Sequence, residues 1–190
     1  MTKDNRRFDP QKKDMLVSPE RLVRWKPTQL LPLAGLQTDQ SALDLGCGPG
    51  FWTLPMAEIV GKSGRIIALD ASPEMLQSLA AKSPPAHVHL MQGELPAISL
   101  PDASVDFIWA AFVFHEVTSP ALLAKEARRA LRPGSRLAVL EWRTDAVAAI
   151  GPPRQHRLSP EQMHSCLRLA GFDEFHQIWQ DDDTYLAVAD

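Results

Sequence analysis

The stretch "SALDLGCGPGFWTLP", residues 41–55, constrains the fold more than any other part of the chain. Residues 42–45 suit a β-strand, three glycines and a proline interrupt them, and apolar residues compatible with a helix follow. This order predicts a strand, a tight turn and a helix whose N-terminus points at a ligand. The first N–H groups of a helix have no partner within the helix, so they are available to bind a ligand.

The spacing of the glycines and one neighbouring acid narrow the choice of ligand. The glycines are Gly46, Gly48 and Gly50, whereas a dinucleotide fingerprint needs its third glycine where Phe51 stands. Asp44, two residues before the first glycine, would repel a pyrophosphate and favour a ligand that carries positive charge. The turn therefore predicts a binding site for a cationic nucleoside.

Strand-like segments and helix starts alternate along the rest of the chain. Ser-Pro pairs begin the helix-forming runs, because Ser can cap free N–H groups and Pro suits the first helical position. These pairs begin at Ser18, Ser72, Ser119 and Ser159. The strand-like segments are residues 42–45, 65–69, 88–91, 105–110 and 136–141. The alternation predicts a parallel sheet wrapped by helices.

The two ends of the chain depart from this rhythm. Residues 172–179 and 184–189 are strand-like and too close together for a crossover helix, so we expect an antiparallel hairpin. Residues 1–35 contain helical segments broken by Pro27 and Pro32, which we interpret as a cap over the ligand edge of the sheet. We expect a single domain, residues 1–190, with a core over residues 36–190. Its class is α/β: a Rossmann-like, doubly wound, mostly parallel seven-stranded sheet.

Composition excludes several classes of protein. A formal charge of −3 without a basic run argues against broad nucleic-acid binding. The charged start offers no secretion signal, and the longest apolar run, residues 107–114, is too short to span a bilayer. Cys47 and Cys166, the two cysteines, suggest neither a disulfide framework nor a zinc site, so we expect a cytoplasmic protein without membrane association.

Three acids follow successive strand-like segments, at the edge where open α/β sheets bind ligands. Asp70 stands where a carboxylate accepts hydrogen bonds from ribose hydroxyls, and Glu94 could accept from an exocyclic amino group. Any one of them could simply cap a helix. Together with Asp44 they outline an adenosine with a positively charged appendage, and the α-ammonium and sulfonium of S-adenosylmethionine match it.

Four segments resemble, in order and spacing, the motifs of class I S-adenosylmethionine-dependent methyltransferases: "LDLGCGPGF", "IIALDASPEML", "MQGELPAISLPDASVDFIWAAFVFHEV" and "RRALRPGSRLAVLEW". The resemblance covers about residues 41–142 and is strongest to small bacterial and archaeal enzymes that methylate small molecules and quinones. It implies cofactor contacts, from the methionine end to the adenine end, by Phe112, Ala110, Asp44, Gly46, Cys47, Gly48, Asp70, Ala71, Met75, Leu95 and Glu94. The resemblance implies that Asp44 reaches the methionine ammonium through water and that Asp70 holds the ribose. The signatures of the quinone-methylating subfamily outside this shared core are not evident.

Candidate proton acceptors follow the fourth and fifth strands. His115, with Glu116 beside it, comes after the fourth strand, Glu141 ends the fifth, and the loop "GPPRQHR" carries Arg154 and His156. A base helps only if the acceptor holds an acidic proton, and methyl transfer itself requires no metal. Structural alternatives exist: His115 as a helix cap and Arg154 as a solvated charge.

The leading hypothesis is methyl transfer to a small-molecule acceptor. A noncatalytic S-adenosylmethionine-binding module and a methyltransferase acting on RNA or protein are the alternatives. Residues 110–114, "AAFVF", stand where enzymes that methylate adenine or glutamine amino groups carry an Asn/Asp-Pro-Pro-aromatic motif, which disfavours that class. The acceptor atom and the oligomeric state stay open.

Overall fold

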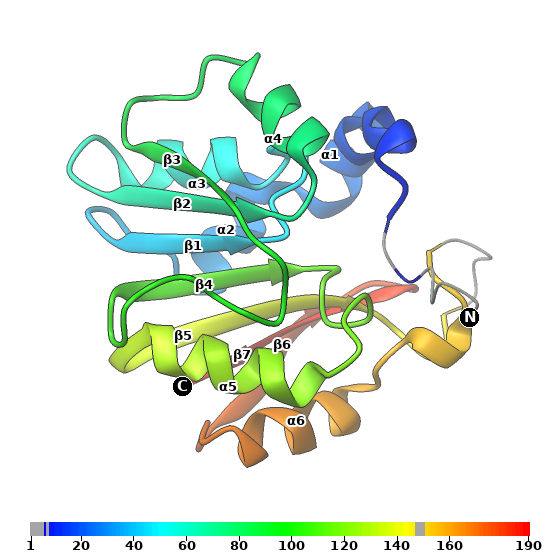
Figure 1. The fold of residues 1–190 in the computed structure, drawn as a ribbon. Coiled ribbons are helices and arrows are strands. Elements are labelled where there is room, and N and C mark those ends of the chain that lie inside the picture. Colours follow the sequence, from blue (N-terminus) through cyan, green and yellow to red (C-terminus); the bar gives the residue numbers. More distant parts are fainter. Residues whose placement is uncertain (1–5, 7, 147–150) are drawn as a thin grey trace.

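A seven-stranded sheet lies between two layers of helices in the computed structural model, which describes residues 6, 8–146 and 151–190 (Figure 1). The strands stand in the order β3-β2-β1-β4-β5-β7-β6, and only β7 runs antiparallel to both of its neighbours. Their bounds are β1 Ser41–Leu45, β2 Arg65–Asp70, β3 Val88–Gln92, β4 Val105–Ala111, β5 Leu131–Trp142, β6 Phe175–Gln180 and β7 Thr184–Ala189. The expected α/β class, the seven strands and the C-terminal hairpin are confirmed.

The position of β1 creates the ligand edge. It pairs in parallel with β2 on one side and with β4 on the other, so that Leu45 is level with both Leu69 and Ala110. After β3 the chain crosses to the far side of β1 and re-enters the sheet as β4. The boundary between β1 and β4 is therefore the topological switch point, where the carboxyl ends of the strands leave room for a ligand.

The fifth strand is longer than the sequence predicts. It begins at Leu131 rather than at Arg136, and its pairing with β4 shifts register, from Val105 opposite Leu131 to Phe107 opposite Arg136. Residues 132–135 stand opposite the single residue Asp106, so β5 has three more residues than β4 in this part of the ladder, as in a large β-bulge. Their sequence, "RPGS", is typical of a turn. The sequence pattern therefore does not indicate that the strand begins before these residues.

The helices begin where the Ser-Pro pairs predict, with one difference in capping. Ser72, Ser119 and Ser159 each accept a hydrogen bond from a backbone N–H of the first turn, whereas Ser18 makes no such bond. Pro32 lies inside its helix and does not break it. The helical bounds are η1 Pro10–Val17, α1 Pro19–Trp25, α2 Pro27–Leu33, α3 Thr53–Val60, α4 Pro73–Ala80, α5 Pro120–Ala130, η2 Arg154–His156 and α6 Pro160–Leu169.

Alternation along the central strands divides the core between the two faces of the sheet. In β4, Phe107 and Trp109 pack on the face that α2 and α3 cover, and Ile108 and Ala110 pack on the face that α5 and α6 cover (Figure 1). Both faces of the strand are buried, as expected for a parallel sheet between two helical layers. This packing makes the carboxyl ends of the strands a rigid platform.

η1 and α1 lie beside these carboxyl ends, whereas α2 packs on a face of the sheet (Figure 1). Arg24 of α1 binds Asp181 and Asp183, in the turn between β6 and β7, at 2.8 Å each. The indole nitrogen of Trp25 donates to the Thr184 hydroxyl at 3.2 Å. These contacts fasten α1 to the hairpin and bring it to the ligand edge. The single domain of residues 1–190, with a cap over residues 1–35 and a core over residues 36–190, stays a prediction.

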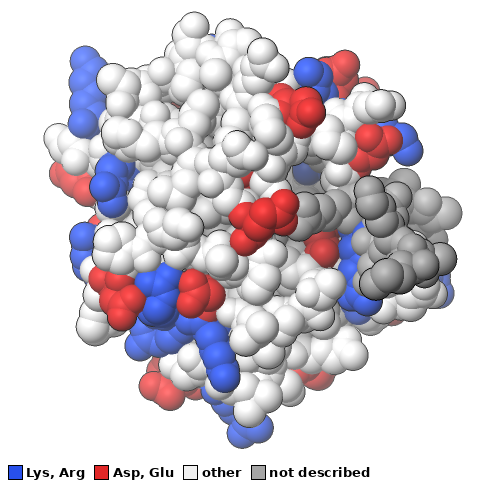
Figure 2. Space-filling view, in the orientation of Figure 1, with Lys and Arg blue, Asp and Glu red and all other residues white. Residues whose placement is uncertain are grey.

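Acidic and basic side chains are interspersed on the face shown in Figure 2, and much of that face is uncharged. It carries no extended basic patch of the kind that tracks a nucleic-acid backbone. Among the described residues, no helix is both long enough and apolar enough to cross a membrane.

Candidate active site

The glycine turn after β1 is tied by its backbone to the end of β2. The N–H of Cys47 donates to the Leu69 carbonyl at 2.9 Å, and the N–H of Gly48 donates to Asp70 Oδ2 at 2.8 Å. Gly46 and Gly48 have φ of +66° and +52°, and a Cβ on Gly46 would lie 2.7 Å from the Val113 side chain. Glycine is required here, because other side chains are strained at such angles and would fill the cradle.

Asp70 holds two elements at this edge together. Its Oδ2 accepts from Gly48 as above, and its Oδ1 accepts from the N–H of Ser72, just before α4, at 2.8 Å. These two hydrogen bonds give Asp70 a structural role at the start of α4, and its contact with a ribose stays a prediction.

Asp44 is a buried carboxylate, 1% exposed, at the carboxyl end of β1. The hydroxyl of Thr53, the first residue of α3, donates to its Oδ2 at 2.6 Å. Burial, with a smaller effect of Asp70, raises the pKa of Asp44 to about 7 even though the Thr53 hydrogen bond opposes the shift. A carboxylate that is costly to ionise gains most from a cationic partner, so Asp44 fits the ammonium group of S-adenosylmethionine.

The residues expected around the adenine lie beyond the ends of β2 and β3. Met75 is buried in α4, whereas Ala71 and Leu95 are half-buried and Glu94 is exposed. The side-chain amide of Gln92 donates to the Ala71 carbonyl at 3.5 Å. The adenine contacts of these residues stay predictions.

An aromatic wall stands on the other side of the glycine turn, after β4. Phe112 has a φ of +62°, which is uncommon for a residue with a side chain, and its ring packs against Trp25 at 4.8 Å and Trp142 at 5.1 Å between centroids. Trp25 also meets Phe51, the residue after the glycine turn, edge to face at 6.5 Å. Ala110, by contrast, has its side chain wholly in the core.

His115 and Glu141 form a buried pair next to this wall. His115 Nδ1 lies 2.9 Å from Glu141 Oε2, and the backbone N–H of His115 donates to Oε1 at 3.2 Å. The exposed fractions are 6% for His115 and 0% for Glu141. Burial opposes the imidazolium, but Glu141, with help from Glu116, raises the pKa of His115 above its ordinary value. The structure thus joins two of the three predicted catalytic residues.

Glu116 stands on the other side of the imidazole. Its Oε1 lies 4.0 Å from His115 Nε2 and accepts from the backbone N–H of Phe8 at 3.2 Å. Burial raises the pKa of Glu116 to about 7. His115 therefore has a carboxyl group near each ring nitrogen.

His156, the third predicted catalytic residue, lies apart from this pair. It is half-buried in η2, and no hydrogen bond or ion pair joins it to His115 or Glu141. Its neighbour Arg157 instead reaches the aromatic wall, with Cζ 5.7 Å from the Trp142 ring centroid. A catalytic role for His156 stays a prediction without a contact to support it.

Comparisons with known proteins agree with this geometry. A family model described as a methyltransferase domain matches residues 43–139, about half of the chain. A crystal structure of a SAM-dependent methyltransferase from Aquifex aeolicus is 30% identical, covers 96% of this chain and 98% of its own, and superposes with a TM-score of 0.88. The chain belongs to the S-adenosylmethionine-dependent methyltransferases.

Curated relatives of this methyltransferase are longer than the chain. A demethylmenaquinone methyltransferase from Geobacillus is 32% identical over 129 residues, which are 66% of this chain and 55% of the relative. An uncharacterized 37.1 kDa protein of a Streptomyces fradiae transposon is 41% identical over 105 residues, 54% of this chain and 30% of that protein. The chain thus spans about half the length, or less, of these relatives.

Two residues of the methyltransferase site escape the sequence analysis. Thr53 is an ordinary helix residue in the sequence, and only the fold shows that its hydroxyl meets Asp44. Arg21 stands in α1, and only the fold places it over the rings of the aromatic wall. The signal available in the sequence was a basic residue near a tryptophan, which is too common to single out a site.

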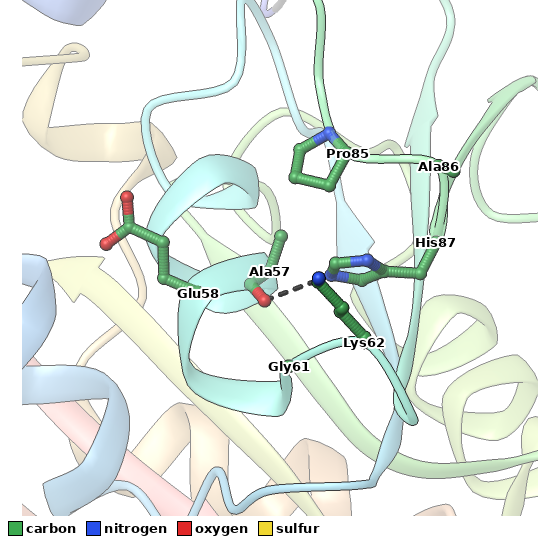
Figure 3. Close-up of a pocket in the computed structure, with 7 residues that line it drawn as sticks. All are labelled: Ala57, Glu58, Gly61, Lys62, Pro85, Ala86 and His87. Atoms are coloured by element: carbon green, nitrogen blue, oxygen red, sulfur yellow. Dashed lines mark hydrogen bonds between the residues drawn. The ribbon is translucent and has the colours of Figure 1, made fainter.

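A second region of the methyltransferase contains a pocket away from the candidate active site. An open pocket of about 650 Å³ lies between the end of α3 and the start of β3, where His87 Nε2 meets the Ala57 carbonyl at 3.0 Å (Figure 3). It stands at the amino ends of the strands, away from the glycine turn. Within the described part of the chain, no group of three or more His, Cys, Asp or Glu side chains could hold a metal ion.

Proposed function

We propose that this methyltransferase transfers a methyl group to a small-molecule acceptor whose acidic proton is taken by His115. The observation that carries the proposal is the buried pairing of His115 Nδ1 with Glu141 at 2.9 Å, beside the aromatic wall that follows β4. A histidine oriented by a buried carboxylate is a common arrangement for proton transfer near neutral pH.

The cofactor site is supplied by the glycine turn and its two acids. Asp44 would hold the ammonium, Asp70 the ribose hydroxyls, and the backbone of Gly46, Cys47 and Gly48 would line the ligand. S-adenosylmethionine supplies a methyl group on a sulfonium, which needs no further activation. Proximity, orientation and exclusion of water are then the main tasks of the protein, worth roughly 7–11 kcal/mol in favourable cases.

The ring nitrogen of His115 that accepts the proton is decided by the tautomer that Glu141 stabilises. Glu141 accepts from Nδ1–H, so the lone pair of a neutral His115 is on Nε2. Nε2 takes the proton of the acceptor, and Glu141 stabilises the resulting imidazolium while it keeps the ring in place. Glu116, whose Oε1 lies 4.0 Å from Nε2, could then accept the proton from the imidazolium.

The acceptor class is inferred from the chemistry of the site and from relatives. A base is useful for a phenol, a hydroquinone or a carbon acid, and the aromatic wall suits a flat apolar molecule. The relatives named demethylmenaquinone methyltransferases support a small acceptor of this kind, although the chain spans only about half of their length. We infer a cytoplasmic setting, consistent with the free thiols of Cys47 and Cys166.

Turnover with labelled cofactor tests the proposal. Purified protein is incubated with methyl-labelled S-adenosylmethionine and a cell metabolite extract from which nucleic acid and protein have been removed. A labelled small product is expected. Cofactor binding without any product would favour a noncatalytic binding module, and labelling confined to added RNA or protein would favour the macromolecular alternative.

A further inference from the structure

The Arg21 guanidinium stands over the ligand edge, on the rings of the aromatic wall. Its Cζ lies 4.3 Å from the ring centroid of Trp25, 5.2 Å from that of Phe51 and 5.5 Å from that of Phe112. Phe51 directly follows the glycine turn and Phe112 directly follows β4. Arg21 therefore lies over rings from the segments that follow β1 and β4, the two strands at the switch point.

This cation has no acidic partner in the part of the chain that the structure describes. Its Nε is buried and forms no hydrogen bond, and no ion pair involves the side chain. Arg24, one turn later on the same helix, instead binds two carboxylates. Burial, together with repulsion from Arg24, lowers the pKa of Arg21 to about 10. Arg21 is half-buried, and a charge withdrawn from water without an acidic partner is costly, so an anionic ligand group would offset that cost.

The two acids of the site fix which end of the ligand faces Arg21. If the ribose is at Asp70, after β2, the adenine extends toward β3 and the amino-acid end extends toward β4. The ammonium and the carboxylate of that end are attached to one carbon. Asp44, at the end of β1, matches the ammonium. The guanidinium of Arg21, over Phe51 and Phe112, matches the carboxylate, which Arg can bind through two parallel hydrogen bonds.

We propose that Arg21 binds the α-carboxylate of S-adenosylmethionine, so that α1 completes the cofactor site. This inference rests on the proposed function. The cap then contributes to cofactor affinity, and its attachment to the β6–β7 turn through Arg24 holds Arg21 in place.

Calorimetry with two ligands tests this role. S-adenosylmethionine is compared with its decarboxylated form, which keeps the ammonium and the sulfonium and lacks only the carboxylate. Arg21→Met keeps an unbranched apolar stem on the Trp25 ring and removes the charge. We expect the variant to bind S-adenosylmethionine about 10- to 100-fold more weakly, the usual effect of losing hydrogen bonds to a charged group, and the decarboxylated form within about threefold of wild type.

Two further variants separate recognition from packing. Arg21→Lys keeps the charge without the paired hydrogen bonds, so it should lose part of the preference for the carboxylated ligand. Arg24→Met, on the same helix, breaks the ion pairs that anchor α1 and should weaken both ligands by the same factor. If Arg21→Met fails to fold, the preference measured in Arg21→Lys decides the question.

Equal weakening of both ligands in the Arg21 variants would show that Arg21 only packs on the rings, and unchanged affinity for S-adenosylmethionine would equally overturn the proposal. A wild-type protein that binds neither ligand would refute the proposed function itself, which is a different result.

Discussion

At the scale of single residues, Asp44 shows how burial prepares a site for a cation. Its pKa is raised to about 7, so the folded protein holds a proton there that the unfolded chain releases near pH 4. The folded state binds more protons between these pH values, and stability from this group therefore falls as pH rises from about 4 to about 7. A bound ligand with a positive charge would stabilise the ionised Asp44 and so offset that loss of stability.

Asp44→Asn tests this balance directly. The amide keeps an acceptor for the Thr53 hydroxyl but cannot ionise. Relative to wild type, we expect the variant to gain roughly 2–3 kcal/mol in the free energy of unfolding between pH 5 and pH 8, and to lose most of its affinity for S-adenosylmethionine. Urea unfolding at the two pH values and calorimetry measure these effects. Parallel pH dependence in the two proteins would contradict the assignment.

His115→Ala tests the chemistry rather than the binding. The proposed proton transfer occurs only during the reaction, so kcat should fall by roughly 10²-fold or more. Affinity for S-adenosylhomocysteine should stay nearly unchanged, because His115 lies in the buried pair with Glu141 rather than at the glycine turn. Steady-state kinetics on an identified acceptor, with calorimetry as control, would show this. A wild-type kcat in the variant would mean that positioning alone drives catalysis.

Glu141→Gln should move the pH profile without removing the base. Glu141 raises the pKa of His115, so a neutral amide in its place should lower that pKa. The wild-type enzyme loses activity as pH falls through the raised pKa, and the variant should keep activity to a lower pH. Arg157 and Glu116 also influence His115, and Glu116 has a pKa of about 7. Glu116→Gln is therefore the control, and an acid limb that moves only in this control would contradict the role of Glu141.

The sequence predicts some residues of the site and not others, for a physical reason. Asp44 and Asp70 are found because parallel strands bring their carboxyl ends to one edge, so their addresses follow from local pattern alone. The His115–Glu141 contact joins residues 26 positions apart and needs the register of β4 against β5. Arg21 depends on how α1 docks, which no local pattern encodes.

At the scale of elements, the same dependence on local sequence explains which predicted helix and strand boundaries are right and which are wrong. The Ser-Pro-Glu sequences at residues 18–20, 72–74 and 159–161 all start helices, because their signals act within one turn. Ser72 and Ser159 cap their helices, whereas at Ser18, which makes no cap hydrogen bond, the proline at the first helical position is the local signal. The start of β5 was missed because its extra residues form a bulge that only the partner strand defines. Pro32 was expected to break a helix, yet α2 keeps it in its second turn.

Two of these helix starts provide a matched test of capping. Ser159 accepts from the backbone N–H of Gln162, whose side chain accepts from the N–H of Ser159, whereas Ser18 makes no cap hydrogen bond. Ser159→Ala should lower the free energy of unfolding by about 1 kcal/mol, and Ser18→Ala by a few tenths at most. Denaturant unfolding of both variants measures the difference. Equal losses would show that the hydroxyl bond is not what starts α6.

At the scale of the whole molecule, the site joins the two ends of the chain. The glycine turn and the two acids come from β1 and β2, but the aromatic wall combines Trp25 of α1 with Trp142 of β5. Arg24 and Trp25 bind residues 181–184, next to the C-terminal strand. The hairpin that reverses the last strand therefore positions the N-terminal cap. If Arg21 binds the cofactor as proposed, cofactor binding is coupled to the docking of both.

This coupling predicts that the right ligand stabilises the whole fold. S-adenosylhomocysteine at 100 times its Kd should add about 2.7 kcal/mol, which for a chain of this size raises the Tm by roughly 5–10 °C. NAD at the same concentration should leave the Tm unchanged, because the third glycine of a dinucleotide site is missing and Asp44 and Asp70 lie close to the turn. A thermal melt followed by circular dichroism gives both numbers. A shift with NAD equal to that with S-adenosylhomocysteine would contradict the cofactor assignment, whatever the acceptor is.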